Sequence, residues 1–206
     1  MDRKEHWNSI YATKADEEVS WTQRDPKASL SLIREVASNG RLIDVGGGTS
    51  ALVERLLHFR YSLTVLDISD AALIRARQKL GERASIVQWI VADITTVRPL
   101  GEFDVWHDRA VFHFLTAKDD REKYIKLAAQ SIPAGGHLII GTFALDGPEK
   151  CSGLVVERYD REKLTNEFGE YFTFKRELSE LHSTPWGKVQ HFYFAVFERI
   201  NPVPPK

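Results

Sequence analysis

The residues with the clearest chemical potential are a run of three glycines between an apolar stretch and a helical one. Gly46, Gly47 and Gly48 follow the apolar stretch Arg41–Val45. Because glycine has no Cβ, its backbone can turn sharply and a bound molecule can approach it closely. A helix that begins after such a turn offers free N–H groups to a polar or anionic ligand. The glycine run therefore predicts a ligand site at a strand-to-helix turn.

Aspartates occupy the corresponding position after three later apolar stretches. These residues are Asp67, Asp93 and Asp108, and Asp67 lies 19 residues beyond Gly48. At that distance an acidic side chain can accept hydrogen bonds from the hydroxyls of a ribose. Taken alone, a run of glycines is equally typical of an ordinary turn, and an aspartate after a strand is equally typical of a helix cap. Because open α/β sheets bind ligands at the carboxyl ends of their strands, the combination predicts a nucleoside-type ligand.

Two classes of nucleotide ligand fit this pattern. Gly46-x-Gly48-x-x-Ala51 matches the dinucleotide fingerprint of NAD enzymes. Asp44, however, lies two residues before Gly46, where a carboxylate suits a cationic ligand better than a pyrophosphate. No second substrate domain follows the predicted sheet. An NAD-dependent oxidoreductase on the same fold and a non-catalytic nucleoside-binding module remain as alternatives to the prediction below.

Alternating strand-like and helical segments must position these residues. Strand-like stretches cover residues 41–45, 62–66, 84–92, 103–107 and 137–143, and helical patterns separate them, which predicts a parallel sheet with helices on both faces. The expected helices include residues 71–80, capped by Ser69, residues 118–131, and a short helix capped by Asp160. Two long strand-like runs follow, Tyr171–Leu181 and Lys188–Arg199. The six residues between them are too few for a parallel crossover. The predicted fold is α/β, a doubly wound, Rossmann-like, seven-strand mixed sheet with a C-terminal antiparallel hairpin.

Length and composition fit a single domain over residues 1–206, with a polar segment at 1–25 and a flexible, proline-rich tail at 201–206. Lys plus Arg number 28 and Asp plus Glu 29, so the net charge of -1 gives no basic excess for a nucleic acid partner. Cys151 is the only cysteine, which favours a reducing, cytoplasmic location. The sequence contains no apolar run of 18 residues, so it predicts no membrane-spanning helix. The spacing of histidines and cysteine predicts no metal site.

Five motifs in order resemble those of the class I S-adenosylmethionine-dependent methyltransferases, over roughly residues 26–200. They are Ile43–Thr49, Val65–Ser69, Val91–Ile94, Phe103–Asp108 and Ile132–Ile140, the last with Ala134 as a departure from the usual Pro-Gly-Gly turn. The resemblance implies transfer of a methyl group from S-adenosylmethionine, leaving S-adenosylhomocysteine. It also implies that the N-terminal segment 1–25 covers the cofactor as a lid.

The same resemblance implies a role for each motif residue. Asp44 would lie beside the methionine moiety, with the glycines against the cofactor backbone. Asp67 would hold the ribose hydroxyls, with Ile68 against the adenine. Asp93 would accept from the adenine amino group, with Ile94 beside it. His107 or Asp108 would contribute backbone contacts to the methionine part.

The methyl acceptor is expected over the ends of the fourth and fifth strands. His113 is the candidate general base, although a histidine between two phenylalanines is more typical of packing. The other candidates on the acceptor side are Trp21, Gln23, Arg109, Tyr159 and His182. The loops around Cys151, Tyr159 and Trp186 resemble more weakly a bacterial branch related to the lysine methyltransferase of citrate synthase. The expected acceptor is an N, O or S atom of a small molecule or a protein lysine, and the oligomeric state is open.

Overall fold

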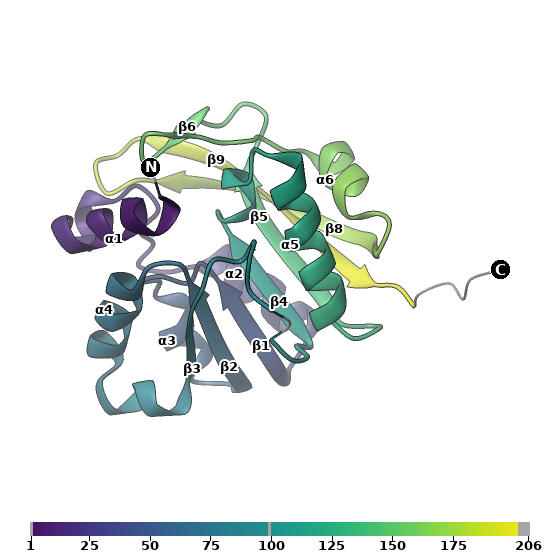
Figure 1. Ribbon diagram of the computed structural model, residues 1–206, viewed down its shortest axis with the longest axis horizontal. Coiled ribbons are helices and arrows are strands. Elements are labelled where there is room, and N and C mark those ends of the chain that lie inside the picture. The colour runs from purple at the N-terminus through teal and green to yellow at the C-terminus, as the bar shows by residue number, and fades with distance from the viewer. Residues whose placement is uncertain (1, 99, 202–206) are drawn as a thin grey trace.

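The computed structural model describes residues 2–98 and 100–201, so the predicted tail lies outside the described residues apart from Asn201. A seven-stranded sheet runs through the molecule in the order β3-β2-β1-β4-β5-β9-β8 (Figure 1). Its strands are β1 (Asn39–Val45), β2 (Arg60–Asp67), β3 (Gln88–Val91), β4 (Val105–Arg109), β5 (His137–Phe143), β8 (Phe172–Ser183) and β9 (Val189–Arg199). A separate small pair consists of β6 (Lys150–Cys151) and β7 (Leu154–Val155).

Strands β1 to β5 pair in parallel, whereas β9 is antiparallel to both β5 and β8. The strand β1 occupies the middle of the parallel part, with β2 on one side and β4 on the other. The predicted mixed sheet with a C-terminal hairpin is confirmed. Successive strands are added on one side of β1 up to β3 and on the other side from β4 onward. Ligands of doubly wound folds bind at the point between β1 and β4 where the strand order reverses in this way.

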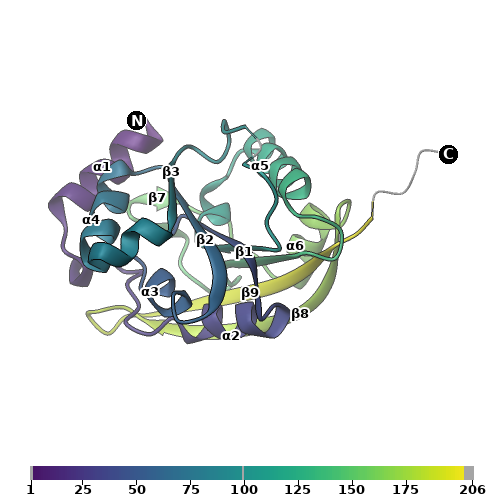
Figure 2. The same cartoon turned by 90° about the horizontal axis from the view of Figure 1, so that it is seen from below.

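Helices cover both faces of the sheet. They are α1 (Arg3–Thr13), α2 (Lys27–Val36), α3 (Leu52–Leu56), α4 (Asp70–Leu80), α5 (Lys118–Ser131) and α6 (Arg161–Phe168), with 3-10 turns η1 (Asp16–Glu18), η2 (Gly81–Ile86) and η3 (Phe112–Phe114). The helices α5 and α6 lie on one face, and α2 and α3 lie on the other (Figures 1 and 2). The helix α1 packs against α4, beyond the end of the parallel strands.

Side-chain caps fix where two of these helices begin. Ser69 accepts a hydrogen bond from the backbone N–H of Ala72 at 3.1 Å, and Asp160 accepts one from Lys163 at 2.9 Å. Such caps satisfy N–H groups that have no partner within the helix. Both caps were predicted from the sequence. Ser69 follows the carboxyl end of β2, and the helix that begins after Asp160 packs against β8.

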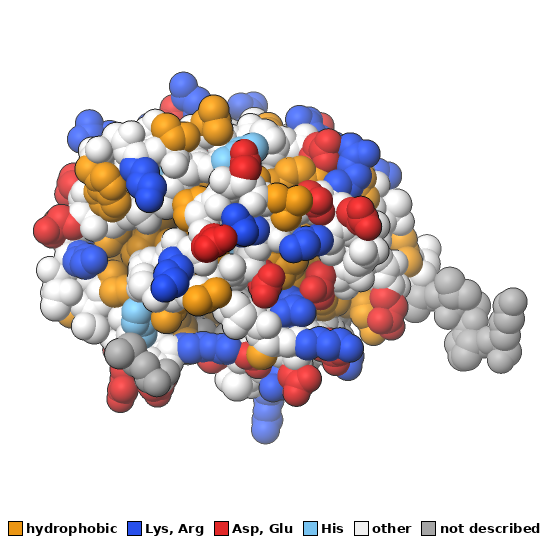
Figure 3. Space-filling model, turned by 90° about the horizontal axis from the view of Figure 1, so that it is seen from above, with side chains coloured by type: hydrophobic (Ala, Val, Ile, Leu, Met, Phe, Trp, Pro, Cys, Tyr) orange, Lys and Arg blue, Asp and Glu red, His pale blue; other side chains and the backbone are white. Residues whose placement is uncertain are grey.

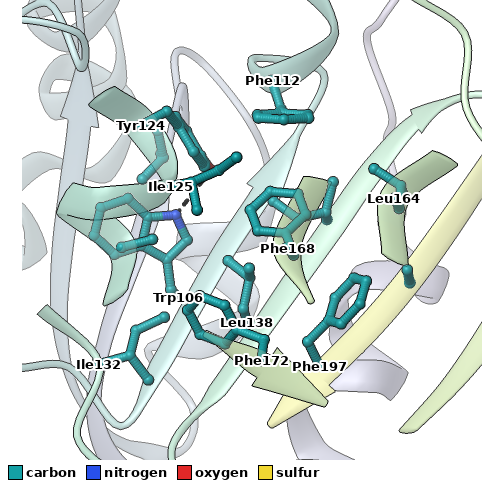
Figure 4. Packing of buried hydrophobic residues seen from close by; sticks show 14 of the residues in the cluster. Trp106, Phe112, Tyr124, Ile125, Ile132, Leu138, Leu164, Phe168, Phe172 and Phe197 are labelled. Atoms are coloured by element: carbon teal, nitrogen blue, oxygen red, sulfur yellow. Dashed lines mark hydrogen bonds between the residues drawn. The ribbon is translucent and has the colours of Figure 1, made fainter. Parts of the chain in front are cut away.

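Each face of the sheet has its own apolar core. On the α5 and α6 face, Trp106, Tyr124 and Phe168 are fully buried and pack together (Figure 4). On the other face, Ile33 of α2 and Phe194 of β9 belong to a second buried cluster. Burying one such side chain stabilises the fold by about 1.5–3 kcal/mol. These cores hold the strand ends in fixed positions.

The main departures from the sequence prediction lie in the connections. The expected strand 84–92 begins only at Gln88, because the preceding residues form the turn η2. Trp89 Nε1 donates to the carbonyl of Ala84 at 2.9 Å and ties that turn to the strand. The expected helix after the glycines shrinks to Leu52–Leu56. No helix among the described residues is long and apolar enough to cross a membrane.

Candidate active site

A cavity lies at the carboxyl ends of β1, β2 and β4, under the N-terminal segment. Three groups of residues line it: the glycine turn, the acidic strand ends and the N-terminal cover. They include Asp44, Gly46, Gly47, Asp67, Ile68, Asp93, Ile94, His107 and Arg109 from the sheet edge, and Arg3, Trp7, Tyr11, Trp21 and Gln23 from the cover. The structure therefore brings together most of the residues that the sequence placed at the cofactor.

The glycine turn has the geometry that requires glycine. Gly46 has a φ of +70° and Gly48 a φ of +49°, which other residues adopt only at a cost. A Cβ on Gly46 would collide with Val111, and one on Gly48 would lie 2.5 Å from Tyr11 Oη. The amide of Gly46 donates to the carbonyl of Leu66 at 2.7 Å. The turn is thus held flat against β2, with its backbone beside the cavity.

Asp67 is a buried carboxylate at the end of β2. Its side chain is 5% exposed, and its Oδ1 accepts from the amide of Ser69 at 2.8 Å. Burial raises the pKa of Asp67 to about 6, and the amides of Ser69 and Gly48 oppose that rise. A buried carboxylate gains most from donors that complete its hydrogen bonds. The two hydroxyls of a ribose are donors of that kind.

Asp93 sits at the next position along the edge. Its Oδ1 accepts from the amide of Thr95 at 2.8 Å and from the hydroxyl of Thr95 at 2.7 Å. Its Oδ2 lies 3.9 Å from Arg3 Nη1. Ile68 and Ile94 line the same part of the cavity. Two apolar side chains and one carboxylate form a surface that suits a flat, amino-bearing base.

Asp44 and His107 form a pair on the neighbouring strands β1 and β4, in the lining of the same cavity. Asp44 Oδ1 lies 2.7 Å from His107 Nδ1, and both residues are buried. Asp44 Oδ2 and His107 Nε2 are buried without a hydrogen-bond partner. The sequence suggested His107 for a backbone contact and did not reveal its pairing with Asp44. The signal for the pair was its position, because both residues come just before the end of neighbouring strands.

Arg109 lies beyond this pair, at the end of β4. Its guanidinium stacks 4.1 Å above the ring of Phe192 and lies 3.7 Å from a carboxylate oxygen of Glu180. Its Nη1 donates to the carbonyl of Trp21 at 3.3 Å. Burial lowers the pKa of Arg109 to about 10, although Glu180 opposes the shift, so the group stays charged near neutral pH. Gln23 donates to the same Glu180 at 3.0 Å.

The N-terminal cover is fastened to α4. Arg75 Nη1 donates to the carbonyls of Tyr11 at 2.8 Å and Lys14 at 2.7 Å, and Arg75 Nη2 donates to Asp16 at 2.8 Å. Edge-to-face contacts join Trp7 to Trp21 at 5.7 Å between ring centroids. Sequence analysis named Trp21 and Gln23 but missed Arg3, Trp7 and Tyr11. The helix α1 buries only Tyr11 among its residues, so its sequence shows no apolar stripe to reveal the contact.

Five of the predicted site residues do not line the cavity, namely Gly48 of the glycine turn, Asp108, Tyr159 and two histidines. Asp108 is fully buried and accepts from Tyr124 Oη at 2.6 Å and from the amide of Val111 at 2.8 Å. Its side chain thus caps η3, and burial raises its pKa to about 6. Tyr159 packs at 5.5 Å from the ring of Phe112 in the core.

The two predicted histidines also lie away from the cavity wall. His182 Nε2 lies 2.6 Å from the carbonyl oxygen of Ser20 and so helps to hold the cover. His113 is fully buried, and its Nδ1 accepts from the amide of Phe143 at 3.4 Å. Burial lowers the pKa of His113 to about 3, and Arg109 adds to that effect. A proton-accepting role for His113 has no support from its position.

Residues 43–140 match the sequence model of the methyltransferase domain. That match covers the glycine turn, the acidic strand ends and the first half of β5, and it agrees with the resemblance drawn from the motifs. The matched part of the chain therefore resembles a methyltransferase domain. Within the described residues, no group of three or more His, Cys, Asp or Glu side chains is arranged to hold a metal ion.

Individual relatives agree with the domain. Nodulation protein S of Sinorhizobium fredii is 27% identical over 100 residues, which span 48% of this chain and 46% of that protein. The matched part is thus about half the length of the curated relative.

Two solved structures share the fold at lower identity. N-methyltransferase NodS from Bradyrhizobium japonicum, in complex with S-adenosylhomocysteine, has a TM-score of 0.68 at 18% identity, covering 87% of this chain and 90% of that chain. The 1,6-didemethyltoxoflavin-N1-methyltransferase of Burkholderia thailandensis has a TM-score of 0.70 at 16% identity, covering 96% and 84%.

Proposed function

We propose that the protein binds S-adenosylmethionine in this cavity and transfers its methyl group to a nitrogen atom of a small molecule. The observation that carries the proposal is the cavity itself, which is lined both by Asp67 and Asp93 and by Asp44 and His107. The first pair suits a nucleoside, and the second offers carboxylate charge to a cationic centre. The methyl group of a sulfonium cofactor has such a centre next to it.

The described residues divide the work of holding the cofactor. Asp67 would accept from the ribose hydroxyls, and Asp93 would accept from the adenine amino group. Ile68 and Ile94 would pack against the adenine ring. Asp44 would lie by the methionine part. The cofactor supplies an activated methyl group, so the protein must chiefly align the acceptor and exclude water.

Exclusion of water is the role that we assign to the N-terminal cover. Trp7, Tyr11 and Trp21 line the cavity from above the sheet edge. The cover leaves the interior of the cavity to a compact acceptor, which favours a small molecule over the side chain of a folded protein. Two relatives by fold are named as N-methyltransferases, and these names support nitrogen as the acceptor atom.

Other acceptors and a cytoplasmic location remain predictions from the sequence. A protein lysine is the alternative acceptor, on the weaker loop resemblance. On the face seen in Figure 3, basic and acidic side chains are interspersed, so that face offers no extended basic surface to a nucleic acid.

An acceptor panel tests the proposal. Labelled S-adenosylmethionine would be incubated with small amines, phenols, carboxylic acids, thiols and lysine-containing proteins, and labelled products would be identified by mass spectrometry. We expect turnover with amines, and we expect Asp67→Asn to reduce it at limiting cofactor. Turnover confined to oxygen, sulfur or protein acceptors would contradict the choice of acceptor. Tight cofactor binding without any turnover would favour a non-catalytic binding module.

A further inference from the structure

The pair of Asp44 and His107 is placed by the pairing of two strands. In the parallel register of β1 and β4, Asp44 lies opposite His107, so both side chains leave the same face of the sheet. Asp44 is 3% exposed and His107 1% exposed, and both line the cavity. The pair is therefore shielded from bulk water and yet adjacent to the space for ligands.

The second nitrogen of the His107 ring has no partner in the protein. Nδ1 is 2.7 Å from Asp44 Oδ1, whereas Nε2 is buried without a hydrogen bond. Buried polar atoms nearly always have a partner, so a bound molecule is the natural partner for Nε2. When a carboxylate accepts from Nδ1–H, the neutral ring keeps its lone pair on Nε2. Nε2 is thus the ring nitrogen left to accept a proton, in a residue that lines the cavity.

We propose that His107 is a catalytic residue whose Nε2 takes the proton that the methyl acceptor must lose, with Asp44 as the residue that positions the ring. The inference deepens the proposed function, because it requires an amine acceptor. A protonated amine has no lone pair with which to attack a methyl group. A base at this position would supply the reactive, neutral form inside the closed cavity.

The step balances in atoms and charge. One N–H bond of the ammonium group breaks and its proton goes to Nε2. The freed lone pair forms the N–C bond to the methyl group. The C–S bond breaks and its electron pair stays on sulfur, which leaves S-adenosylhomocysteine and a methylated ammonium group. The proton on Nε2 then leaves to solvent when the cover opens.

Other charged groups surround the pair without replacing it. Arg109 lies further along β4 and faces Glu180 of β8. Asp67 of β2 is near enough to Asp44 for the two charges to repel each other. Asp108 already accepts a hydrogen bond from the hydroxyl of Tyr124. Among these groups, His107 is the one that lines the cavity and keeps a ring nitrogen without a hydrogen-bond partner.

The first test needs no methyl acceptor. Nitrogen-15 NMR of the full chain with S-adenosylhomocysteine, assigned through His107→Gln, reports which ring nitrogen carries hydrogen near neutral pH. We expect His107 to be neutral with hydrogen on Nδ1, and we expect Asp44→Asn to disturb that state. Hydrogen on Nε2, or a doubly protonated ring, would overturn the proposal because no lone pair would be available.

The second test separates proton transfer from cofactor binding. For an amine that the wild type methylates, His107→Gln should lower kcat by about 100-fold or more, with the KM for the amine within about threefold. Added imidazole should restore part of the lost kcat. His137→Gln is the matched control, because His137 begins β5 at the far end of the sheet, and this variant should keep its rate and show no rescue.

The outcomes distinguish this inference from the proposed function. Calorimetry with S-adenosylhomocysteine should give similar affinities for the wild type and His107→Gln. If His107→Gln keeps its kcat or loses its cofactor affinity, His107 is not the proton acceptor. If the wild type itself binds no cofactor or methylates no amine, the proposed function fails, and the NMR result still decides the state of His107.

Discussion

Asp67 is the single side chain on which cofactor affinity should depend most. It is buried, and one of its oxygens already accepts a hydrogen bond from the amide of Ser69. Its pKa of about 6 reflects the cost of burying the charge. Donors from a ribose would offset that cost, so the carboxylate is better satisfied with ligand than without it.

Replacing this carboxylate should weaken binding. We expect Asp67→Ala to lower the affinity for S-adenosylhomocysteine by tenfold or more, equivalent to about 1–3 kcal/mol for a lost charge-assisted hydrogen bond. Titration calorimetry measures the change. Asp119→Asn is the control, because Asp119 is exposed in the first turn of α5. Equal affinities for Asp67→Ala and the wild type would remove Asp67 from the cofactor site.

His113 belongs to the stability of the fold, and its contribution depends on pH. Burial lowers its pKa from the usual 6.5 to about 3. The unfolded chain therefore takes up a proton on this ring that the folded chain refuses, and stability falls as the pH drops from about 6.5 toward 3. Asp67 and Asp108 act in the opposite direction, because their raised pKa values of about 6 favour the folded state as the pH falls toward 4.

Removing the titrating ring should change the slope of this dependence. We expect His113→Gln to lose less free energy of unfolding than the wild type between about pH 6.5 and pH 5, by at most ~1.4 kcal/mol per pH unit. Urea unfolding at several pH values measures it, and both aspartates are common to the two chains. Parallel pH profiles would show that His113 does not resist protonation in the fold.

At the scale of elements, the helix α1 and the turn η1 form a cover that Arg75 and Lys79 of α4 help to fasten. Arg75 reaches the end of α1 and the turn η1 at the same time. The cover must open for the cofactor to enter and leave. The strength of this attachment should therefore govern the rate of exchange.

Loosening the attachment should speed up cofactor release. We expect Arg75→Gln to raise the dissociation rate of S-adenosylhomocysteine by about fivefold, equivalent to ~1 kcal/mol for partly exposed contacts. Stopped-flow fluorescence of Trp7 and Trp21 follows the release. Arg77→Gln, on the same helix but stacked on Trp89, should leave the rate unchanged. If both variants behave alike, α1 is not held by Arg75.

Elements with a strong local signal were predicted closely. The sequence placed α5 and β5 at their observed bounds, because Pro133 to Gly136 separates a helical period from an apolar run. The caps at Ser69 and Asp160 were likewise local. The strand-end lining of the cavity followed as well, since the glycine turn and the strand ends are set by chain order.

Contacts between distant segments were beyond sequence analysis. The bond between Asp44 and His107 depends on the register of β1 and β4, which a single sequence does not state. The place of α1 over the cavity depends on Tyr11 and on Arg75 from another helix. His113 was chosen as a base from its chemistry, but its burial follows from the packing of η3 against β5.

At the scale of the molecule, an apolar core covers each face of the sheet, and the cavity lies at the edge formed by the carboxyl ends of the parallel strands. The parallel strands deliver the acidic residues to that edge, and the terminal hairpin extends the sheet on the side of Arg109. Because a ligand in the cavity would contact both the strand ends and the N-terminal cover, its binding should stabilise the whole fold.

The most direct test is the melting temperature of the full chain with S-adenosylhomocysteine, S-adenosylmethionine or NAD. A ligand at about 100 times its Kd stabilises the folded state by ~2.7 kcal/mol. For a chain of this size that corresponds to a rise of about 5–10 °C. We predict that rise with the two adenosyl compounds and none with NAD. No rise with either adenosyl compound, or a rise with NAD alone, would contradict a methyltransferase site in this cavity.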